Sequence, residues 1–154
     1  MRKAVVKETR LYRVASVVFV LFAAGHTFVF LSFKPPTPEA AAVRESMMRV
    51  HFHVGASTFS YGGFYVGFGL TITAYLLLAA LLTWHLGGVA RTAPGTIGAL
   101  GCGFFALQLV CLVLCWVYFS AVPAALSAFL AVCLGSAAWI TRSHPETGAR
   151  RVAT

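Results

Sequence analysis

The sequence has very few acidic residues. It contains no aspartate, and its four carboxylates are Glu8, Glu39, Glu45 and Glu146, all of which we expect to lie outside the apolar segments. Acid–base catalysis and proton relays in an apolar site usually depend on a carboxylate, or on a histidine that a carboxylate orients. Neither a Ser/His/Asp set nor an HExxH motif is present. This scarcity disfavours hydrolysis, carboxylate-based isomerisation and proton pumping through carboxylates.

Charge of either sign is also scarce. Charged residues make up 10% of the 154 residues and hydrophobic residues 59%. A soluble domain of this length exposes too much surface for so few charges. Crossing the hydrocarbon takes about 20 apolar residues as a helix, and four charge-free runs have that length. They cover residues 14–33, 64–84, 97–119 and 122–140. We therefore predict an all-α fold, a four-helix transmembrane bundle that forms one integral membrane domain over residues 1–154.

The basic residues indicate how the chain is oriented. The net charge is +8, and nine of the twelve basic residues lie before the first run, between the second and third, or after the last. The positive-inside rule then places both termini in the cytoplasm and residues 34–60 on the outer face. The chain is therefore predicted to be a multi-pass membrane protein with both termini in the cytoplasm. We expect membrane lipids as partners, with a larger membrane complex or a homo-oligomer left open, and no nucleic acid.

The outer loop is predicted to contain a surface helix over residues 38–54. Pro35 and Pro36 end the first span, because proline lacks an N–H group and disfavours helical geometry in the residue before it. Thr37 has the character of an N-cap, followed by Pro38 at the first helical position and Glu39 in the first turn. Apolar residues then recur at helical spacing. Such an amphipathic helix suits the outer membrane surface, or a soluble cap packed over the bundle.

Small residues at a spacing of four suggest where helices pack closely. Gly63 and Gly67 share one face at the start of the second span, and Gly95, Ala99 and Gly103 share one on the third. Small residues at this spacing let two backbones approach each other in a membrane. We predict helix packing at these five positions, against the alternative that the glycines open a cleft for a ligand.

Polar side chains near the outer face form the candidate site. His26 lies about 10 Å below the outer end of the first span, and an ionisable group at that depth needs a partner. We expect His26 to hydrogen-bond to the segment between His51 and Tyr65. The predicted ligand-binding residues are His26, Thr27, His51, His53, Tyr61, Tyr65 and Gln108.

Three interpretations of these residues remain open. They form a hydrogen-bonded structural cluster, or a pocket for a lipophilic ligand such as a lipid or quinone, or a haem b or metal site. No cofactor is predicted; the alternative is haem b or a metal ion held by two imidazoles from His26, His51 and His53. On a helix, His51 and His53 would point about 200° apart, so they chelate one ion together only if the chain is extended there.

The first half of the chain resembles a known group of proteins. The resemblance is carried by Gly25-His26-Thr27, KPPTPE, Val50-His51-Phe52, FSYGGFYVGFG and Trp84-His85. These residues are similar to those of an uncharacterised family of small bacterial four-span integral membrane proteins. The resemblance implies the same architecture and a bacterial source, so the predicted location is the bacterial cytoplasmic (inner) membrane. The family carries no catalytic assignment. The expected function is a non-enzymatic membrane protein, either a lipophilic-ligand binder or an accessory subunit of a membrane complex, with a haem- or metal-binding redox protein as the alternative.

Overall fold

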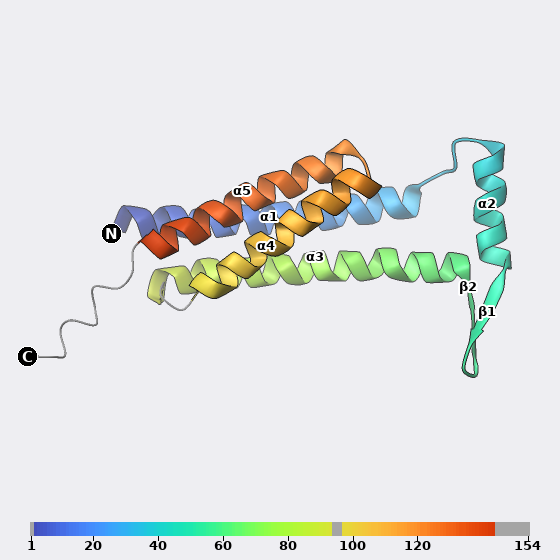
Figure 1. The fold of residues 1–154 in the computed structure, drawn as a ribbon, viewed down its shortest axis with the longest axis horizontal. Helices are drawn as coiled ribbons and strands as arrows, with labels where there is room; N and C mark the ends of the chain where they lie inside the picture. Colours follow the sequence, from blue (N-terminus) through green and yellow to red (C-terminus); the bar gives the residue numbers. More distant parts are fainter. Residues whose placement is uncertain (1, 94–96, 144–154) are drawn as a thin grey trace, which may run out of the picture. The chain divides into compact units, whose positions relative to one another are not determined.

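A computed structural model describes residues 2–93 and 97–143, which are mostly helical (Figure 1). Four helices are long and apolar enough to cross a membrane. They are α1 (Arg2–Ser32), α3 (Tyr61–Thr92), α4 (Gly98–Tyr118) and α5 (Ala121–Ser143). A short helix, α2 (Pro38–Arg49), and a hairpin of β1 (His51–Val54) and β2 (Ser57–Ser60) come between α1 and α3 in the sequence. The predicted all-α fold with four apolar helices of a multi-pass membrane protein is confirmed.

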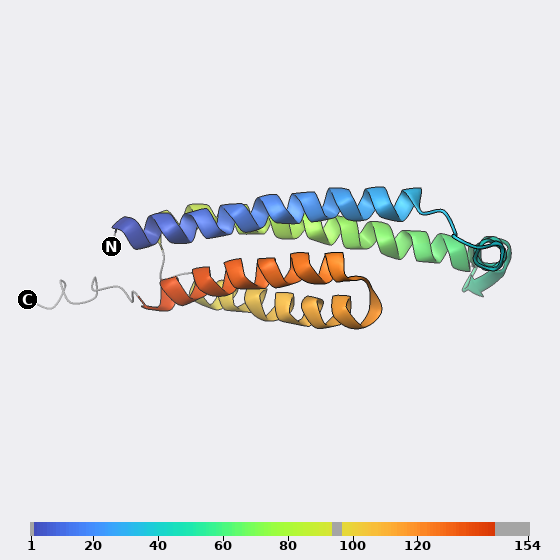
Figure 2. The same ribbon diagram turned by 90° about the horizontal axis from the view of Figure 1, so that it is seen from above.

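The chain packs as two compact units rather than as one evenly connected body. The four-helix unit consists of Met1–Phe22 and Leu78–Thr154, and the hairpin unit consists of Ala23–Leu77. Helices α1 and α3 contribute to both units, whereas α4 and α5 belong to the four-helix unit, where they lie side by side (Figure 2). The hairpin unit holds α2 and the hairpin. Each unit has its own internal contacts, and they are described separately below.

Buried residues of the four-helix unit recur at alternating spacings of three and four. This heptad spacing keeps one face of a helix towards its neighbours, as in left-handed bundles. Most of these residues are small, which allows the helices to approach closely. The stripe on this face of α3 is Ala80, Thr83, Gly87 and Ala90, and that of α5 is Ala124, Ser127, Ala131, Leu134, Ala138 and Thr141. Leu86 on α3, and Leu130, Cys133 and Ala137 on α5, are buried beside the stripe.

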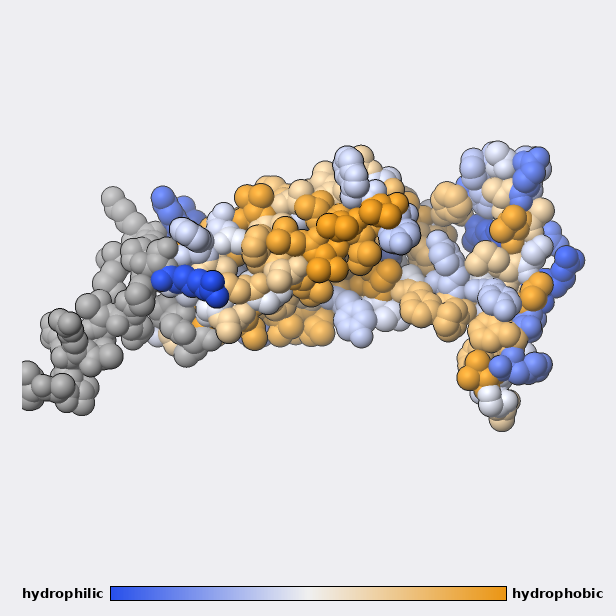
Figure 3. Space-filling model, in the orientation of Figure 1, coloured by the Kyte–Doolittle hydropathy of each residue, from blue (hydrophilic) through white to orange (hydrophobic). Residues whose placement is uncertain are grey.

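The outer surface of α4 and α5 is strongly apolar (Figure 3). Trp116, Val122 and Val132 are between 67% and 75% exposed. In water, each Å² of such surface would cost about 25 cal/mol, whereas hydrocarbon chains solvate it well. These exposed side chains are therefore consistent with helices that face lipid.

Helix α2 begins as predicted. Thr37 has extended backbone angles (φ −132°, ψ 158°), and its hydroxyl accepts a hydrogen bond from the N–H of Ala40 at 3.2 Å. Pro38 is the first helical residue, and Glu39 lies in the first turn. The backbone N–H of Glu39 and the Thr37 hydroxyl lower the pKa of the Glu39 carboxyl below its ordinary value of 4.5. The N-cap prediction is confirmed, and the same groups stabilise the ionised carboxylate.

The start of α2 should therefore loosen in acid. A lowered pKa means that the carboxylate stabilises the folded turn above pH 4.5, and that this contribution disappears as the pH falls through the lower folded value. We expect the amide protection of residues 40–42 to be constant from pH 7 to 5 and to drop in stronger acid, as measured by hydrogen exchange corrected for intrinsic rates. Glu39→Gln should remove the pH dependence; a Gln variant with the same acid loss would contradict this origin.

Helix α2 ends at Arg49, so the predicted helix over residues 38–54 is wrong in its last turn. Val50 is extended (φ −79°, ψ 125°), and residues 51–54 form a strand. The chain reverses at Gly55, whose φ of +60° is unfavourable for other residues. The physical reason is local: Val50, Phe52 and Val54 alternate with the two histidines. This period of two, in β-branched and aromatic residues, favours a strand over a helix.

Candidate functional site

His26 is half-buried in the hairpin unit and bonds to the backbone of α3. Its Nε2 lies 3.1 Å from the carbonyl oxygen of Gly69, which can only accept, so Nε2 carries the proton and donates it. The imidazole stacks on Phe30, with ring centroids 5.6 Å apart and planes 11° apart. Phe30 also occupies the space that a side chain at residue 69 would need, and its ring contacts Tyr65 at 5.3 Å. This arrangement binds the end of α1 to the beginning of α3.

The partner of His26 is not in the predicted segment between His51 and Tyr65. It is Gly69, one turn further along α3. Depth explains the difference: His26 lies six residues before the end of α1, and Gly69 eight residues after the beginning of α3, distances of about 9 and 12 Å along the helices. Residues at similar depth meet, and residues 51–60 belong to the hairpin beyond the helix.

Thr27 continues the same network. Its hydroxyl donates to the carbonyl of Ala23 at 2.8 Å, and its oxygen lies 2.8 Å from the hydroxyl oxygen of Thr73. The Thr73 hydroxyl has an alternative acceptor in the Gly69 carbonyl, but at 3.4 Å this contact is longer than the 2.8 Å bond of Thr27 to Ala23. The Thr27 proton is thus used within α1, and Thr73 is the donor in the bond between the two helices. His26 and Thr27 thus form two adjacent polar links between α1 and α3. This geometry matches the structural interpretation of His26 more closely than a free ligand position.

Removing the imidazole should have a modest effect. We expect His26→Leu to lower the free energy of unfolding by about 0.5–1.5 kcal/mol, the usual net value of one hydrogen bond. The loss stays small because the Gly69 carbonyl remains a helix acceptor. Hydrogen exchange at residues 66–70 should rise. Thr71→Val is the matched control, since the Thr71 hydroxyl bonds only within its own helix, to Gly67. Equal exchange in both variants would contradict a link through His26.

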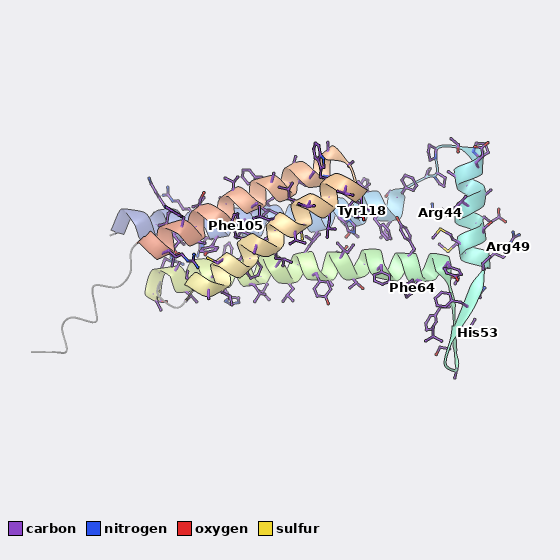
Figure 4. The ribbon with its side chains drawn as sticks, in the orientation of Figure 1. Arg44, Arg49, His53, Phe64, Phe105 and Tyr118 are labelled. Atoms are coloured by element: carbon purple, nitrogen blue, oxygen red, sulfur yellow. The ribbon has the colours of Figure 1, made fainter. Side chains whose placement is uncertain are left out.

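The hairpin has one aromatic face. Phe52 and Phe59 are directly opposite each other in the register of β1 and β2, with ring centroids 6.0 Å apart. Phe52 also contacts Tyr61 at 4.8 Å and Phe64 at 5.7 Å, and Phe64 contacts Phe68 at 4.7 Å. We call these five residues the aromatic cluster. It attaches the hairpin to the first turns of α3, where Figure 4 shows Phe64 beside the hairpin.

The opposite face of the hairpin is polar. It carries His51 and His53 on β1, opposite Ser60 and Thr58 on β2. His51 donates from Nδ1 to the carbonyl of Arg49 at 2.7 Å, and Nδ1 of His53 lies 3.0 Å from the hydroxyl of Thr58. Both imidazoles are exposed. The two histidines are therefore on one side of a strand, where the predicted helix would have separated them.

Three of the predicted site residues are thus part of the His26 network, and three are at the hairpin. His26, Thr27 and Tyr65 form the first group, and Tyr61 joins the hairpin through the aromatic cluster with His51 and His53 on the other face. Gln108 belongs to the four-helix unit, where it is 5% exposed. The predicted residues therefore occupy distinct positions with different roles.

Sequence reasoning missed a polar cluster in the four-helix unit. Glu8, predicted to lie outside the spans, is 2% exposed within the apolar part of α1, which begins at Val6. Its carboxylate accepts a hydrogen bond from the hydroxyl of Thr141 on α5, and the fully buried Tyr12 lies beside both. Spacing could have revealed it, because Glu8, Tyr12, Ala15 and Phe19 follow one heptad stripe. The predicted apolar run begins after the charged residue Arg13, so it excluded Glu8, although Glu8 continues the buried stripe of α1.

The close helix contacts lie at other glycines than those predicted. A side chain at Gly67 or Gly103 would meet no atom of the described residues within 4 Å, and one at Gly63 would meet only Ser60. Ala99 is exposed, and Gly95 lies outside the described residues. For Gly63, Gly67, Ala99 and Gly103 the prediction of close packing within this chain is wrong, because these four positions are off the buried stripes; for Gly95 it stays a prediction. The glycines where a side chain would meet another element are Gly62, Gly69, Gly87, Gly101 and Gly135.

Known proteins give no assignment for this site. The chain matches no family model, no curated protein and no solved structure. Among residues 2–93 and 97–143, no three His, Cys, Asp or Glu side chains come together as ligands for a metal ion. The features of the molecule that bear on function are therefore the aromatic and polar faces of the hairpin, together with α2 and α3 on either side of it.

Proposed function

We propose that this protein is a non-enzymatic protein of the bacterial cytoplasmic membrane whose hairpin unit binds lipid at the outer face. The observation that carries the proposal is the aromatic cluster, which joins the hairpin to the first turns of an apolar helix of 32 residues. Tyrosine side chains concentrate where a membrane helix meets the headgroup layer, and phenylalanine rings are among the apolar groups that membrane-surface segments bury at the acyl boundary. Phe59, Tyr61, Phe64 and Phe68 are between 45% and 57% exposed, so they remain accessible to acyl chains.

The polar groups next to the aromatic cluster support the same proposal. Arg44 and Arg49 project from α2 (Figure 4). The guanidinium of Arg44 donates to the carbonyl of Phe33 at 2.7 Å, and Arg49 pairs with Glu45 at 3.9 Å. Helix α2 has no buried side chain, and Val43 and Met48 are 60% and 43% exposed. Cationic and apolar groups on one short helix suit the boundary between phosphate headgroups and acyl chains.

The non-enzymatic part of the proposal follows from the histidine environments. His26, His51 and His53 bond to two backbone carbonyls and a threonine hydroxyl, and none of the three bonds to a carboxylate in the described part of the chain. A histidine without a carboxylate partner is poorly oriented for acid–base catalysis. Glu8, the buried carboxylate, is bonded to Thr141 in the other unit.

Lipid retention tests the proposal. We expect native mass spectrometry of protein released from nanodiscs to show tightly bound phospholipid, and to show less of it for Phe52→Ala/Phe64→Ala. The matched control is Phe119→Ala, which removes a ring that is 63% exposed outside the aromatic cluster. Equal lipid retention in all three proteins would contradict lipid binding by the hairpin unit. A Soret band in the purified protein that is lost in His26→Ala would instead establish the haem alternative.

The orientation is tested separately by labelling. We expect Ser46→Cys, in a background without the four native cysteines, to react with a membrane-impermeant maleimide added to intact cells from the outside. Thr147→Cys should react only after the cells are opened, because the proposed topology places both termini in the cytoplasm. Labelling of residue 46 only in opened cells would reverse the topology.

A further inference from the structure

The two hairpin histidines have the placement of a chelating pair. Side chains at positions i and i+2 of a strand point to the same face, with Cα atoms about 6.8 Å apart. His51 and His53 satisfy this relation on β1, and both are exposed. The aromatic cluster occupies the opposite face of the hairpin, so the two histidines lie on the face that points away from the cluster.

The hydrogen bonds of the two rings leave the same nitrogen available on each. Nδ1 of His51 donates to the carbonyl of Arg49, so its proton is on Nδ1 and the lone pair on Nε2. Nδ1 of His53 lies 3.0 Å from the hydroxyl of Thr58. A hydroxyl can accept as well as donate, so the tautomer with the proton on Nδ1 and the lone pair on Nε2 is open to His53 too. Among the residues that the structure describes, no group hydrogen-bonds to either Nε2 atom. Metal-binding histidines are typically fixed in this way, with the second ring nitrogen donating to a carbonyl or another polar group.

We propose that His51 and His53 bind one divalent transition metal ion of the Zn²⁺, Ni²⁺ and Cu²⁺ class through their Nε2 atoms. Imidazole nitrogen suits these ions, and water molecules complete the coordination. The site goes beyond lipid binding, since it lies on the hairpin face opposite the aromatic cluster. No bond other than the metal–nitrogen bonds forms, and no electron is transferred. With two protein ligands, the affinity should follow the order Cu²⁺ above Ni²⁺ and Zn²⁺.

Calorimetric titration of the tag-free, detergent-purified protein with ZnCl₂ and NiCl₂ tests this site. We expect one ion per chain, at least tenfold weaker binding in His51→Ala and in His53→Ala, and no binding to the hairpin in the double variant. His85→Ala is the control, because His85 is an exposed histidine of the four-helix unit, and its titration should match that of the unchanged protein. Equal affinity in His51→Ala/His53→Ala would overturn the proposal and identify the binding as adventitious.

A second pair of variants tests the face rather than the number of histidines. In His53→Ala/Ser60→His the new imidazole lies directly opposite His51 on the same face, and the bond from His51 Nδ1 to the Arg49 carbonyl is kept, so binding should return. In His53→Ala/Ser57→His the new imidazole lies on the same strand but on the aromatic face, so binding should stay weak. Circular dichroism verifies that both variants fold. Electron paramagnetic resonance of bound Cu²⁺ should show two nitrogen ligands for the first variant and fewer for the second; identical spectra and affinities would refute a site defined by the hairpin face.

Discussion

Replacing Thr141 by valine is expected to lower the free energy of unfolding of the four-helix unit by about 1.5–3 kcal/mol, the usual net value of a hydrogen bond to a charged group. The hydroxyl of Thr141 donates to the carboxylate of Glu8, which is only 2% exposed. Valine has nearly the same shape as threonine and keeps the packing, so the loss isolates the hydrogen bond. The measurement is unfolding by sodium dodecyl sulfate in mixed micelles, followed by circular dichroism.

Two further variants separate this bond from general disturbance of α5. Thr141→Ser keeps the hydroxyl and should retain most of the stability. Glu8→Leu/Thr141→Val removes both polar partners, and it should be more stable than the sum of the two single changes predicts, because both single changes remove the same hydrogen bond. Strict additivity of Glu8→Leu and Thr141→Val would show that the two residues do not stabilise one another.

Replacing Gly87 by leucine is expected to separate α1 from α3 and destabilise the four-helix unit. A Cβ atom at Gly87 would lie 3.3 Å from the backbone oxygen of Thr9 and 3.3 Å from Cβ of Tyr12. Neither atom can move without moving α1, so the remaining leucine atoms have no space. Overpacking of this kind costs about 1–3 kcal/mol, and occasionally more. The same micelle unfolding experiment measures it.

The adjacent glycine is a matched control for this change. A Cβ atom at Gly88 would meet no described atom within 4 Å. Both substitutions raise the intrinsic helix propensity of α3 by the same amount, somewhat less than the about 0.8–1.0 kcal/mol that separates glycine from alanine. Gly88→Leu should therefore be neutral or slightly stabilising, whereas Gly87→Leu should be destabilising. Similar stability of the two variants would mean that α1 does not approach α3 at Gly87.

The four apolar helices could be predicted from the sequence, because a helix that crosses the hydrocarbon layer requires a long run of apolar residues, and such a run is visible in the sequence. The start of α2 could be predicted as well, because an N-cap depends on residues that are adjacent in the chain. The hairpin was missed although its signal is local. The alternation Val50, His51, Phe52, His53, Val54 has the period of a strand, but Val50 and Val54 also continue the helical spacing of Val43 and Met47, so the two patterns compete there.

The candidate site was harder to predict, because it depends on which residues share a depth and a face. His26 meets Gly69 rather than a side chain, and no composition signal marks a backbone carbonyl as a partner. Glu8 pairs with a threonine 133 residues away. A charge rule placed Glu8 outside the membrane helix, while its heptad position placed it in the core. Glu8 is buried, so its position on the packing stripe and not its charge determines where it lies.

The hairpin also limits how deeply α3 can sink into a bilayer. In a sheet of only two strands, the outward-facing N–H and C=O groups of each strand have no strand partner, and hydrocarbon offers them none. Strands β1 and β2 must therefore stay in water or among headgroups, and β2 ends at Ser60, directly before the first residue of α3. Tyr61 is thus held at the membrane boundary by the solvation needs of its neighbours. The hairpin therefore fixes the depth of the Tyr61 end of α3. In a thicker bilayer, for example, the opposite end of α3 would change its depth, whereas Tyr61 would stay at the boundary.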